Sequence, residues 1–486
     1  MPDDLESKLL CADCVRESFL NDEIAKHGSV AMCDYCGEEG STFDIGAVSD
    51  RVDGAFQRHF SRSRMEMNGY EWAMSKDSES SFEFEPEGEP IVYAIMNAAE
   101  IPESAATDIQ SVLEDRYSDF EAAQIGETTE YDSDLYYHEI KADDREWQET
   151  WFAFERLLKT EARFFSSHAL GVLTSVFEGI HLMRTRKNAP LVVDGGAGTP
   201  YEFLFRARAF QSSRKLEAAL LRPDKELGPP PSAFAASGRM NARGISLFYG
   251  ATDPETAVAE VRPPVGSEVA IGRFQVVRPL RLLDLTALSG VGAAGSYFDP
   301  EYAGILSRMM FLRSLSRRMA RPVMPDDQEF EYLPTQAIAD FLATDTVTPL
   351  DGIIFPSVQV GDGKQNVVLF HKASLVGTIS IPDGTETDVH TTRQDDDGCY
   401  PEYSVVWRLA PEEKQEPQPK SSDIFSDFWA FQTARNDDID FGNGRDVTLR
   451  ITPNDLEVRS IKGISFDTED HKVGHLAYAM PKEPGF

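Results

Sequence analysis

The chain has 486 residues, of which 41% are hydrophobic and 10% aromatic, enough for about two to four domains with real cores. Its 82 acidic residues outnumber 47 basic ones, giving a formal net charge of −35. Because so acidic a surface repels phosphate backbones, we expect no nucleic-acid partner. No apolar run reaches the roughly 18–20 residues that cross a bilayer, and the acidic N-terminus lacks a signal-peptide core. We therefore expect a cytoplasmic protein without a membrane partner.

Residues 1–45 are predicted to form a zinc-binding knuckle. They hold two Cys-x-x-Cys pairs, each of which can point two thiolates at one ion. Four thiolates around Zn²⁺ complete a tetrahedral site and leave no position for a reacting water, so the metal is expected to be structural. The alternative is four buried free cysteines with coincidental spacing. The predicted ligands are Cys11, Cys14, Cys33 and Cys36.

Residues 46–190 are predicted to form a helical domain. Apolar residues recur at helical spacing in two groups, which are Trp151, Phe154, Leu157 and Leu158, and then Leu170, Leu173, Val176 and Phe177. A further helix is expected after Pro102. The acidic segment 75–90, with two prolines, is typical of a solvated linker.

The same region contains Arg163 and His168, a spacing that helical HEPN ribonucleases also use. With nine histidines in the chain, about one such match is expected by chance. The acidic composition also disfavours RNA as a substrate. We therefore interpret both residues as helix-surface polar groups, and an RNase role stays open.

Residues 195–376 are predicted to form a mixed α+β domain. Short β-like runs occupy 246–251, 268–277, 280–286 and 351–358. A helix is expected after Asp253, with that residue as N-cap and Pro254 in the first turn, and another at 334–343. Because strands and helices alternate without a regular βαβ repeat, we expect a curved α+β core and not a doubly wound sheet.

Residues 377–486 are predicted to be an acidic linker with a small β-rich extension. Two polar stretches, 385–398 and 412–423, indicate mobile segments. The segments 403–409 and 446–466 alternate as strands do. No function is predicted for this region. The whole chain is thus expected to be multidomain and α+β.

Four sequence blocks carry a resemblance to a known family. The first is SGRMNARGISLFYGATDPETAVAEVRP at 237–263, in which Gly-Arg-x-Asn precedes a strand ending in Tyr and a helix bearing Ala-Glu. The blocks EYLPTQAIADF, DGIIFPS and KQNVVLF follow in the family's order. Residues ~200–375 therefore resemble RES domains. The N-terminal knuckle and helices resemble the region, sometimes described as HEPN-like, that is attached to one branch of RES proteins.

The resemblance implies a fold similar to ADP-ribosyltransferase toxins and an activity that destroys NAD⁺. The family's catalytic residues carry over onto Arg239, Tyr249, Glu260 and Ser357. Further substrate-binding residues implied by the family blocks are Asn241, Asn366 and, less securely matched, Arg206.

These residue types suit cleavage of the nicotinamide–ribose bond. The transition state resembles an oxocarbenium ion, and a fixed carboxylate can stabilise its charge, a role we assign to Glu260. Arg239 is expected to clamp the diphosphate and Tyr249 to stack on nicotinamide. Ser357, helped by Asn366, is expected to hydrogen-bond the ribose or the carboxamide.

The leading hypothesis is an NAD⁺ glycohydrolase or phosphorylase that depletes cellular NAD⁺ as a toxin or defence effector. Its partners would be NAD⁺ and a protein regulator or antitoxin, with the N-terminal region regulatory. Water and phosphate remain open as acceptors. Two alternatives are an ADP-ribosyltransferase that modifies a macromolecule and a non-catalytic interaction module.

Overall fold

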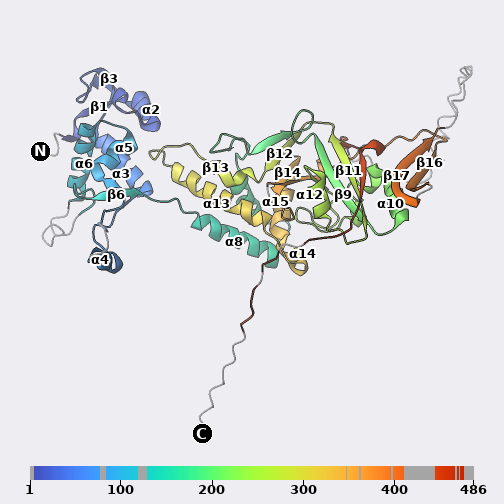
Figure 1. Cartoon of the computed structure of the whole chain (residues 1–486). Helices are drawn as coiled ribbons and strands as arrows, with labels where there is room; N and C mark the ends of the chain where they lie inside the picture. The colour runs from blue at the N-terminus through green and yellow to red at the C-terminus, as the bar shows by residue number, and fades with distance from the viewer. Residues whose placement is uncertain are drawn as a thin grey trace, which may run out of the picture. The chain divides into compact units, whose positions relative to one another are not determined.

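The computed structural model describes residues 5–76, 84–118, 129–345, 347, 349–360, 363–395, 398–409, 444–465, 468–469 and 471–474 (Figure 1). The fold is a mixed α+β architecture, as predicted. The chain divides into two compact units and passes between them several times. Unit 1 comprises 1–193, 238–242 and 282–355, and unit 2 comprises 194–237, 243–281 and 356–486. Among the described residues, no helix combines the length and apolar character that a bilayer crossing needs.

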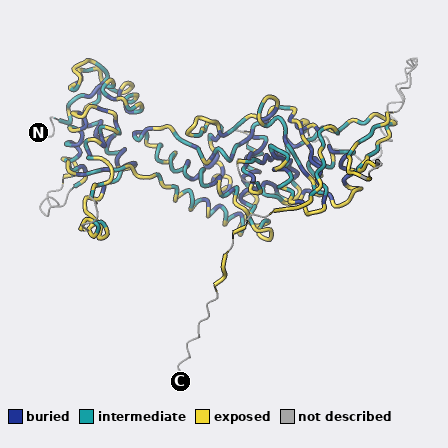
Figure 2. The backbone as a smooth tube through the Cα atoms, in the orientation of Figure 1, coloured by how far each residue is buried: buried dark blue, intermediate teal, exposed yellow. Residues whose placement is uncertain are grey.

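Unit 1 begins with a small sheet and a helix that share a core with the helices that follow. The elements are β1 (Leu9–Cys11), η1 (Ala12–Cys14), α2 (Ser18–His27), β2 (Ser29–Met32), β3 (Glu39–Asp44), α3 (Ile45–His59), β4 (Phe60–Arg62), α4 (Gly69–Ser75), β5 (Glu89–Pro90), α5 (Ile91–Ala99), α6 (Glu103–Tyr117) and β6 (Tyr136–Glu139). The antiparallel strands run in the order β1-β3-β2 and β4-β6-β5. Leu20 and Ile24 of α2 join buried side chains of α3, α5 and α6 in one cluster. Figure 2 colours the backbone of buried residues dark blue. This core therefore contains residues from both sides of the predicted boundary after residue 45. The division of the chain into the four predicted domains stays a prediction.

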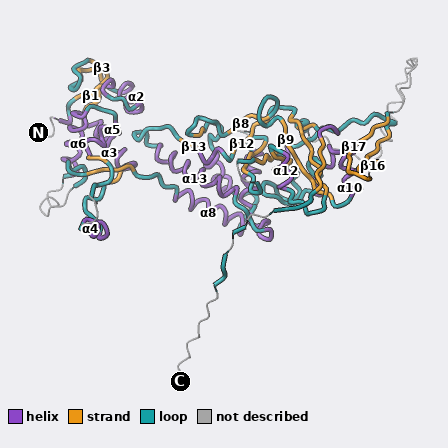
Figure 3. Tube along the Cα trace, in the orientation of Figure 1, coloured by secondary structure: helices purple, strands orange, loops and turns teal. Residues whose placement is uncertain are grey.

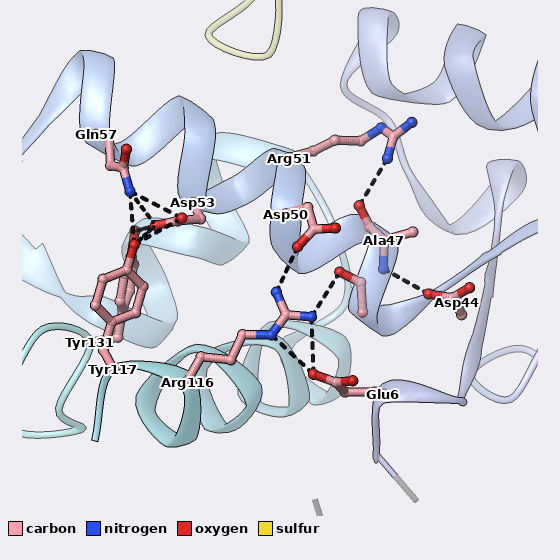
Figure 4. Close-up of polar contacts among 11 residues, drawn as sticks. Glu6, Asp44, Ala47, Asp50, Arg51, Asp53, Gln57, Arg116, Tyr117 and Tyr131 are labelled. Atoms are coloured by element: carbon pink, nitrogen blue, oxygen red, sulfur yellow. Dashed lines mark hydrogen bonds and ion pairs between the residues drawn. The ribbon is translucent and has the colours of Figure 1, made fainter. Parts of the chain in front are cut away.

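A polar network supports this core from the side of α3 (Figure 4). The carboxylate of Asp53 accepts hydrogen bonds from the hydroxyls of Tyr117, at 3.0 Å, and Tyr131, at 2.7 Å. Arg116 of α6 donates to Glu6 at 2.9 Å and to Asp50 at 2.7 Å. Burial, followed by the bond to Asp53, raises the pKa of Tyr131, so its hydroxyl remains a donor at neutral pH.

The second part of unit 1 is built on three helices that pack together. Helix α8 contacts both α13 and α15. The elements are α8 (Arg145–Thr160), α9 (Ser167–Phe177), β7 (Arg184–Thr185), β12 (Leu280–Asp284), η3 (Ala287–Gly290), β13 (Val291–Gly292), α13 (Tyr302–Ala320), η4 (Pro325–Asp327), α14 (Gln328–Glu331), α15 (Leu333–Thr344) and β14 (Gly352–Pro356), with β8 (Val192–Gly195) spanning the sequence boundary between the units. Strands β12 and β14 pair in parallel.

The helices predicted from apolar spacing are confirmed in α8 and α9, and those expected after Pro102 and at 334–343 are confirmed in α6 and α15. Trp151, Phe154 and Leu158 are buried on α8. One residue of the second group departs from the prediction, because Leu170 is 58% exposed. It lies in the first turn of α9, ahead of the stretch where Leu173 and Val176 are buried.

Unit 2 is dominated by strands, shown in orange in Figure 3. Its sheet has the order β18-β11-β9-β10-β15, with β19 also pairing β11, and these pairs are antiparallel. The elements are β9 (Phe203–Phe210), α10 (Ser213–Leu221), α11 (Pro223–Glu226), η2 (Ser232–Phe234), β10 (Phe248–Ala251), α12 (Pro254–Glu260), β11 (Glu268–Val276), β15 (Gln365–Leu369), η5 (His371–Ala373), β16 (Glu386–Asp395), β17 (Gly398–Arg408), β18 (Leu449–Arg450), η6 (Pro453–Asp455) and β19 (Leu456–Ser460).

The prediction that 385–398 is a mobile stretch is wrong. Strands β16 and β17 form an antiparallel hairpin across it. The stabilising partners come from the second strand, where Val405 faces Val389 and Trp407 faces Thr387. The first strand is polar, so its own sequence does not indicate that it pairs with a second strand. The other stretch, 412–423, and part of the predicted linker at 75–90 lie outside the described residues.

Candidate functional site

Helix α12 positions Glu260 in unit 2. As predicted, the helix starts at a capped turn, because the side chain of Asp253 accepts a 3.0 Å hydrogen bond from the Thr256 backbone N–H and Pro254 follows it. Ala257 packs the helix against a cluster that contains Ala207, Ala251 and strand residues of β11. Glu260 is the last helical residue, so its side chain leaves the helix at its C-terminal end.

Two buried side chains hold one oxygen of the Glu260 carboxylate. The hydroxyl of Ser357 donates to Oε1 at 2.8 Å, and the amide Nδ2 of Asn366 donates to the same oxygen at 2.7 Å. Ser357 is 6% exposed and Asn366 is 4% exposed, whereas Glu260 itself is exposed. No described residue donates to Oε2. One carboxylate oxygen is therefore fixed and the other is available to a ligand.

The amide of Asn366 has a further property, since its Oδ1 is buried and, among the described residues, has no hydrogen-bond partner. The amide orientation is set by its neighbour, because a carboxylate accepts only from the NH₂ side. A buried acceptor without a donor costs about 1–3 kcal/mol, so such atoms are rare in folded proteins. A ligand with an N–H or O–H group would satisfy it.

Tyr249 lies on the same face of the sheet as Asn366. In the antiparallel pairing of β10 with β15, Ala251 is opposite Asn366, and Tyr249 is opposite Val368. Residues two apart on a strand share a face, so Tyr249 is a diagonal neighbour of Asn366. The sheet register thus places Tyr249 near Asn366, and the hydrogen bonds to Glu260 bring Ser357 and Glu260 into the same region of unit 2.

Arg206 lies on β9, but its side chain is not part of this group. Ala207 packs toward α12, so strand alternation directs Arg206 to the opposite face. There its guanidinium lies 5.3 Å from the Phe248 ring and donates to the backbone oxygen of Tyr249 at 3.2 Å. Desolvation, with repulsion from Arg208, lowers the pKa of Arg206 to about 10, which still leaves it charged at neutral pH.

Arg239 and Asn241 belong to unit 1. Arg239 donates to the backbone oxygens of Met319, at 2.6 Å, and Arg321, at 3.0 Å, at the C-terminal end of α13. Its own backbone oxygen accepts from the hydroxyl of Thr335 at 2.5 Å. Asn241 is 4% exposed and donates to the Ala242 backbone oxygen at 3.2 Å. Both residues are well anchored, and their roles toward a substrate remain predictions.

The four predicted metal ligands come together in unit 1. The sulfur atoms of Cys11, Cys14, Cys33 and Cys36 all lie within 4.8 Å of one another. The Sγ atoms of Cys11 and Cys36 are 3.5 Å apart, and those of Cys14 and Cys33 are 3.9 Å apart. A tetrahedral Zn²⁺ with bonds of about 2.3 Å requires sulfur separations of about 3.8 Å, so the arrangement fits this ion.

The cysteine environment also favours deprotonation of one ligand. Desolvation opposes it, yet backbone N–H groups of Cys36, Tyr35 and Cys11 together lower the pKa of Cys33 to about 7. Burial raises the pKa of Cys11 and Cys14. A bound cation would reverse that effect, because a coordinating thiol is deprotonated.

Unit 2 thus contains an α+β domain in which a helix-end carboxylate is held by a hydroxyl and an amide from the strand region. Residues 204–391 match the family model of the RES domain. The matched segment begins within β9 and includes Tyr249, Glu260, Ser357 and Asn366. Comparison with curated proteins gives no match.

Two features of the site were missed by sequence reasoning. Lys364 pairs with Asp253 at 3.3 Å and so ties the start of α12 to the residue preceding β15. The unpartnered Oδ1 of Asn366 was also not foreseen. Lys364 is the first residue of the KQNVVLF block, which is a usable signal, whereas an unsatisfied acceptor is visible only in three dimensions.

Proposed function

We propose that this protein cleaves the nicotinamide–ribose bond of NAD⁺ and so acts as an NAD⁺ glycohydrolase or phosphorylase. The observation that carries the proposal is the Glu260 carboxylate, with Oε1 fixed by Ser357 and Asn366 and Oε2 unpartnered among the described residues. A RES domain is consistent with an enzyme that acts on NAD. The proposed biological role is depletion of cellular NAD⁺ as a toxin or defence effector.

In the proposed reaction, the bond between ribose C1 and the nicotinamide nitrogen breaks, and nicotinamide leaves with the bonding electrons. Because the leaving group is cationic, it departs as a neutral molecule without a general acid. Positive charge develops on the ribose, and the Glu260 carboxylate stabilises it while Oε2 holds a ribose hydroxyl. An oxygen of water or phosphate then bonds to C1. With water, its proton is released to solvent.

The other residues are proposed to bind and orient the substrate. Asn366 Oδ1 would accept a hydrogen bond from the nicotinamide carboxamide, which satisfies this buried atom. Tyr249, on the same sheet face, would stack on the nicotinamide ring. Arg239 and Asn241 are proposed as phosphate and ribose ligands. Arg206 is proposed to act at a distance on the anionic substrate, since its side chain faces away from α12.

The acceptor can be separated from the cleavage step. A hydrolase would give nicotinamide and ADP-ribose in any buffer. A phosphorylase would require inorganic phosphate and would give a phosphorylated ADP-ribose with an additional phosphorus signal by NMR. An ADP-ribosyltransferase would instead transfer the label of ³²P-NAD⁺ to a macromolecule.

The four cysteines are proposed to bind a structural Zn²⁺, which would crosslink β1, η1 and the turn after β2. When bound, the ion supplies only folding energy, because four thiolates leave it no open position. The N-terminal part of unit 1 would then serve as a platform for a protein regulator or antitoxin.

The proposal can be tested in growing cells. Induction of the wild-type protein should lower the NAD⁺ pool and stop growth, whereas Glu260→Gln should do neither at equal protein levels. Glu255→Gln, an exposed residue on the same helix, is the matched control and should behave as wild type. An NAD⁺ pool that stays constant with wild-type protein would argue against the proposal if the purified protein is also inactive.

A further inference from the structure

Unit 1 contains a cavity that is lined by three arginines and by none of the four clustered cysteines. This cavity of 280 Å³ is formed where α8 faces the end of α13 and the start of α15. Its lining includes Trp151 and Phe152 of α8, Arg318 and Arg321 near the end of α13, and Arg239 and Tyr332. Helix α8 precedes the residues that match the RES domain, so this cavity combines side chains from inside and outside that match.

The cavity carries a local positive charge in a strongly acidic chain. Two carboxylates line it, but Glu331 is paired with Lys159 at 2.7 Å, and Glu155 accepts a hydrogen bond from Trp151 Nε1 at 2.7 Å. The lining also includes three guanidinium groups, which belong to Arg239, Arg318 and Arg321. The Arg321 side chain is exposed and has no hydrogen-bond or ion-pair partner among the described residues.

Arg239 also retains donors for a ligand. A guanidinium has five N–H groups, and the bonds to the oxygens of Met319 and Arg321 use two of them. These two bonds fix the orientation of the guanidinium. A preoriented, partly unused guanidinium beside an unpaired one is the arrangement that phosphate oxygens favour.

Aromatic rings provide flat surfaces next to these charges. Phe152 is 59% exposed, and the Arg318 guanidinium lies 5.1 Å from its ring. Arg239 lies 5.0 Å from the Tyr332 ring. Rings and guanidinium planes of this kind stack on heterocyclic bases. The combination selects a small ligand that is both anionic and aromatic.

We propose that this cavity binds a nucleoside diphosphate, with the phosphates on Arg239 and Arg321 and the base against Phe152 or Tyr332. The volume is close to the lower end of about 300–1,000 Å³ for ligand pockets, which suits one nucleotide. This inference deepens the proposed function, because it rests on Arg239 as a phosphate ligand. It adds that α8 is required for nucleotide binding.

The proposal is tested with ADP, which has no bond for the enzyme to cleave. Trp151 lines the cavity, so ADP should change the intrinsic fluorescence of the full-length protein, and calorimetry should give a dissociation constant below about 1 mM. Arg321→Glu should weaken binding about tenfold or more, because it removes a charge-assisted contact and adds repulsion. Phe152→Ala should also weaken it.

Arg317→Glu is the matched control. Arg317 is exposed near the same end of α13 and gives the same charge change, but it does not line this cavity. It should weaken ADP binding less than about twofold at 0.15 M salt, where exposed charges are screened. Equal losses in the Arg317 and Arg321 variants would overturn the proposal, as would no binding or tighter binding of RNA than of ADP. Tight ADP binding without NAD⁺ cleavage would refute the proposed function alone.

Discussion

The cysteine cluster of unit 1 and the carboxylate cluster of unit 2 both gather side chains from distant parts of the sequence, but they differ in what they leave open. The four sulfur atoms lie within 4.8 Å of one another and account for every position of a tetrahedral ion. At Glu260, one carboxylate oxygen receives two donors and the other receives none from the described residues. Nearby, Asn366 Oδ1 is buried without a partner.

The difference teaches how to separate structural from reactive clusters. A set of ligands that is complete once an ion binds contributes to folding. A set that stays incomplete in the folded protein retains interactions for a substrate, at a cost in stability. Substitutions in the first cluster should therefore change stability most, and substitutions in the second should change turnover most.

The largest effect is expected in the cysteine cluster. Cys33→Ser removes one of the four proposed metal ligands, so bound zinc should fall below one ion per chain and unit 1 should lose several kcal/mol of stability, on the order expected for structural zinc. Metal content by mass spectrometry and thermal unfolding by circular dichroism measure both. Cys399→Ser, at a cysteine that belongs to neither Cys-x-x-Cys pair, is the control and should change neither. Normal zinc content in the Cys33 variant would contradict the metal assignment.

Asn366→Ala should separate turnover from stability. Turnover of NAD⁺ should fall about tenfold or more, because the carboxylate loses a donor and the substrate loses an acceptor. The melting temperature should change little, since the substitution also removes a buried unsatisfied oxygen. The exposed Asn454 gives a control in Asn454→Ala. A large loss of stability with unchanged turnover would identify Asn366 as purely structural.

The tyrosine network of unit 1 should behave in the opposite way. Tyr131→Phe removes a buried hydroxyl from Asp53 and should cost about 1–3 kcal/mol of unfolding free energy in urea. Tyr117→Phe should cost less, because Tyr117 is less buried and binds Asp53 at a longer distance. The double variant measures the coupling between the two. NAD⁺ turnover should be unchanged at temperatures where both variants are folded.

The smallest effect concerns pH. Burial, followed by the charge of Arg58, lowers the pKa of His59 from its usual value of 6.5, although Glu139 opposes this. The unfolded chain then binds the proton more tightly than the folded chain, so stability is full above about pH 6.5 and declines as the pH falls below it. His59→Phe should remove this dependence and fit beside Tyr297 and Tyr302. If the unfolding temperatures of the wild type and of His59→Phe fall by the same amount between pH 7 and pH 5, His59 is excluded as the cause of the decline.

The sequence predicted those elements whose signals are local. The cap at Asp253, the helix after Pro254 and the strand at 268–277 follow from neighbouring residues, and all appear in the structure. The paired cysteine spacing likewise predicted the cluster. One element with a clear local signal was missed. The 19-residue helix α13 was not predicted, although its sequence repeats apolar residues at helical spacing.

The remaining features depend on pairing between distant segments. Ser357 and Asn366 contact Glu260 across 97 and 106 residues of sequence, so only the family resemblance placed them together in advance. Strand alternation shows that Arg206 and Ala207 face opposite ways, but it does not show which face α12 covers. The hairpin of β16 and β17 also depends on a second strand that the polar first strand does not reveal.

The most direct test of the account is nicotinamide release by the purified protein, measured side by side for the wild type, Glu260→Gln and Glu255→Gln with NAD⁺ as substrate. Glu260→Gln keeps the side chain's shape but removes its charge, so the rate should fall about 10²–10³-fold, while the Glu255 variant should match the wild type. Equal rates for wild type and Glu260→Gln would contradict the central role of this carboxylate.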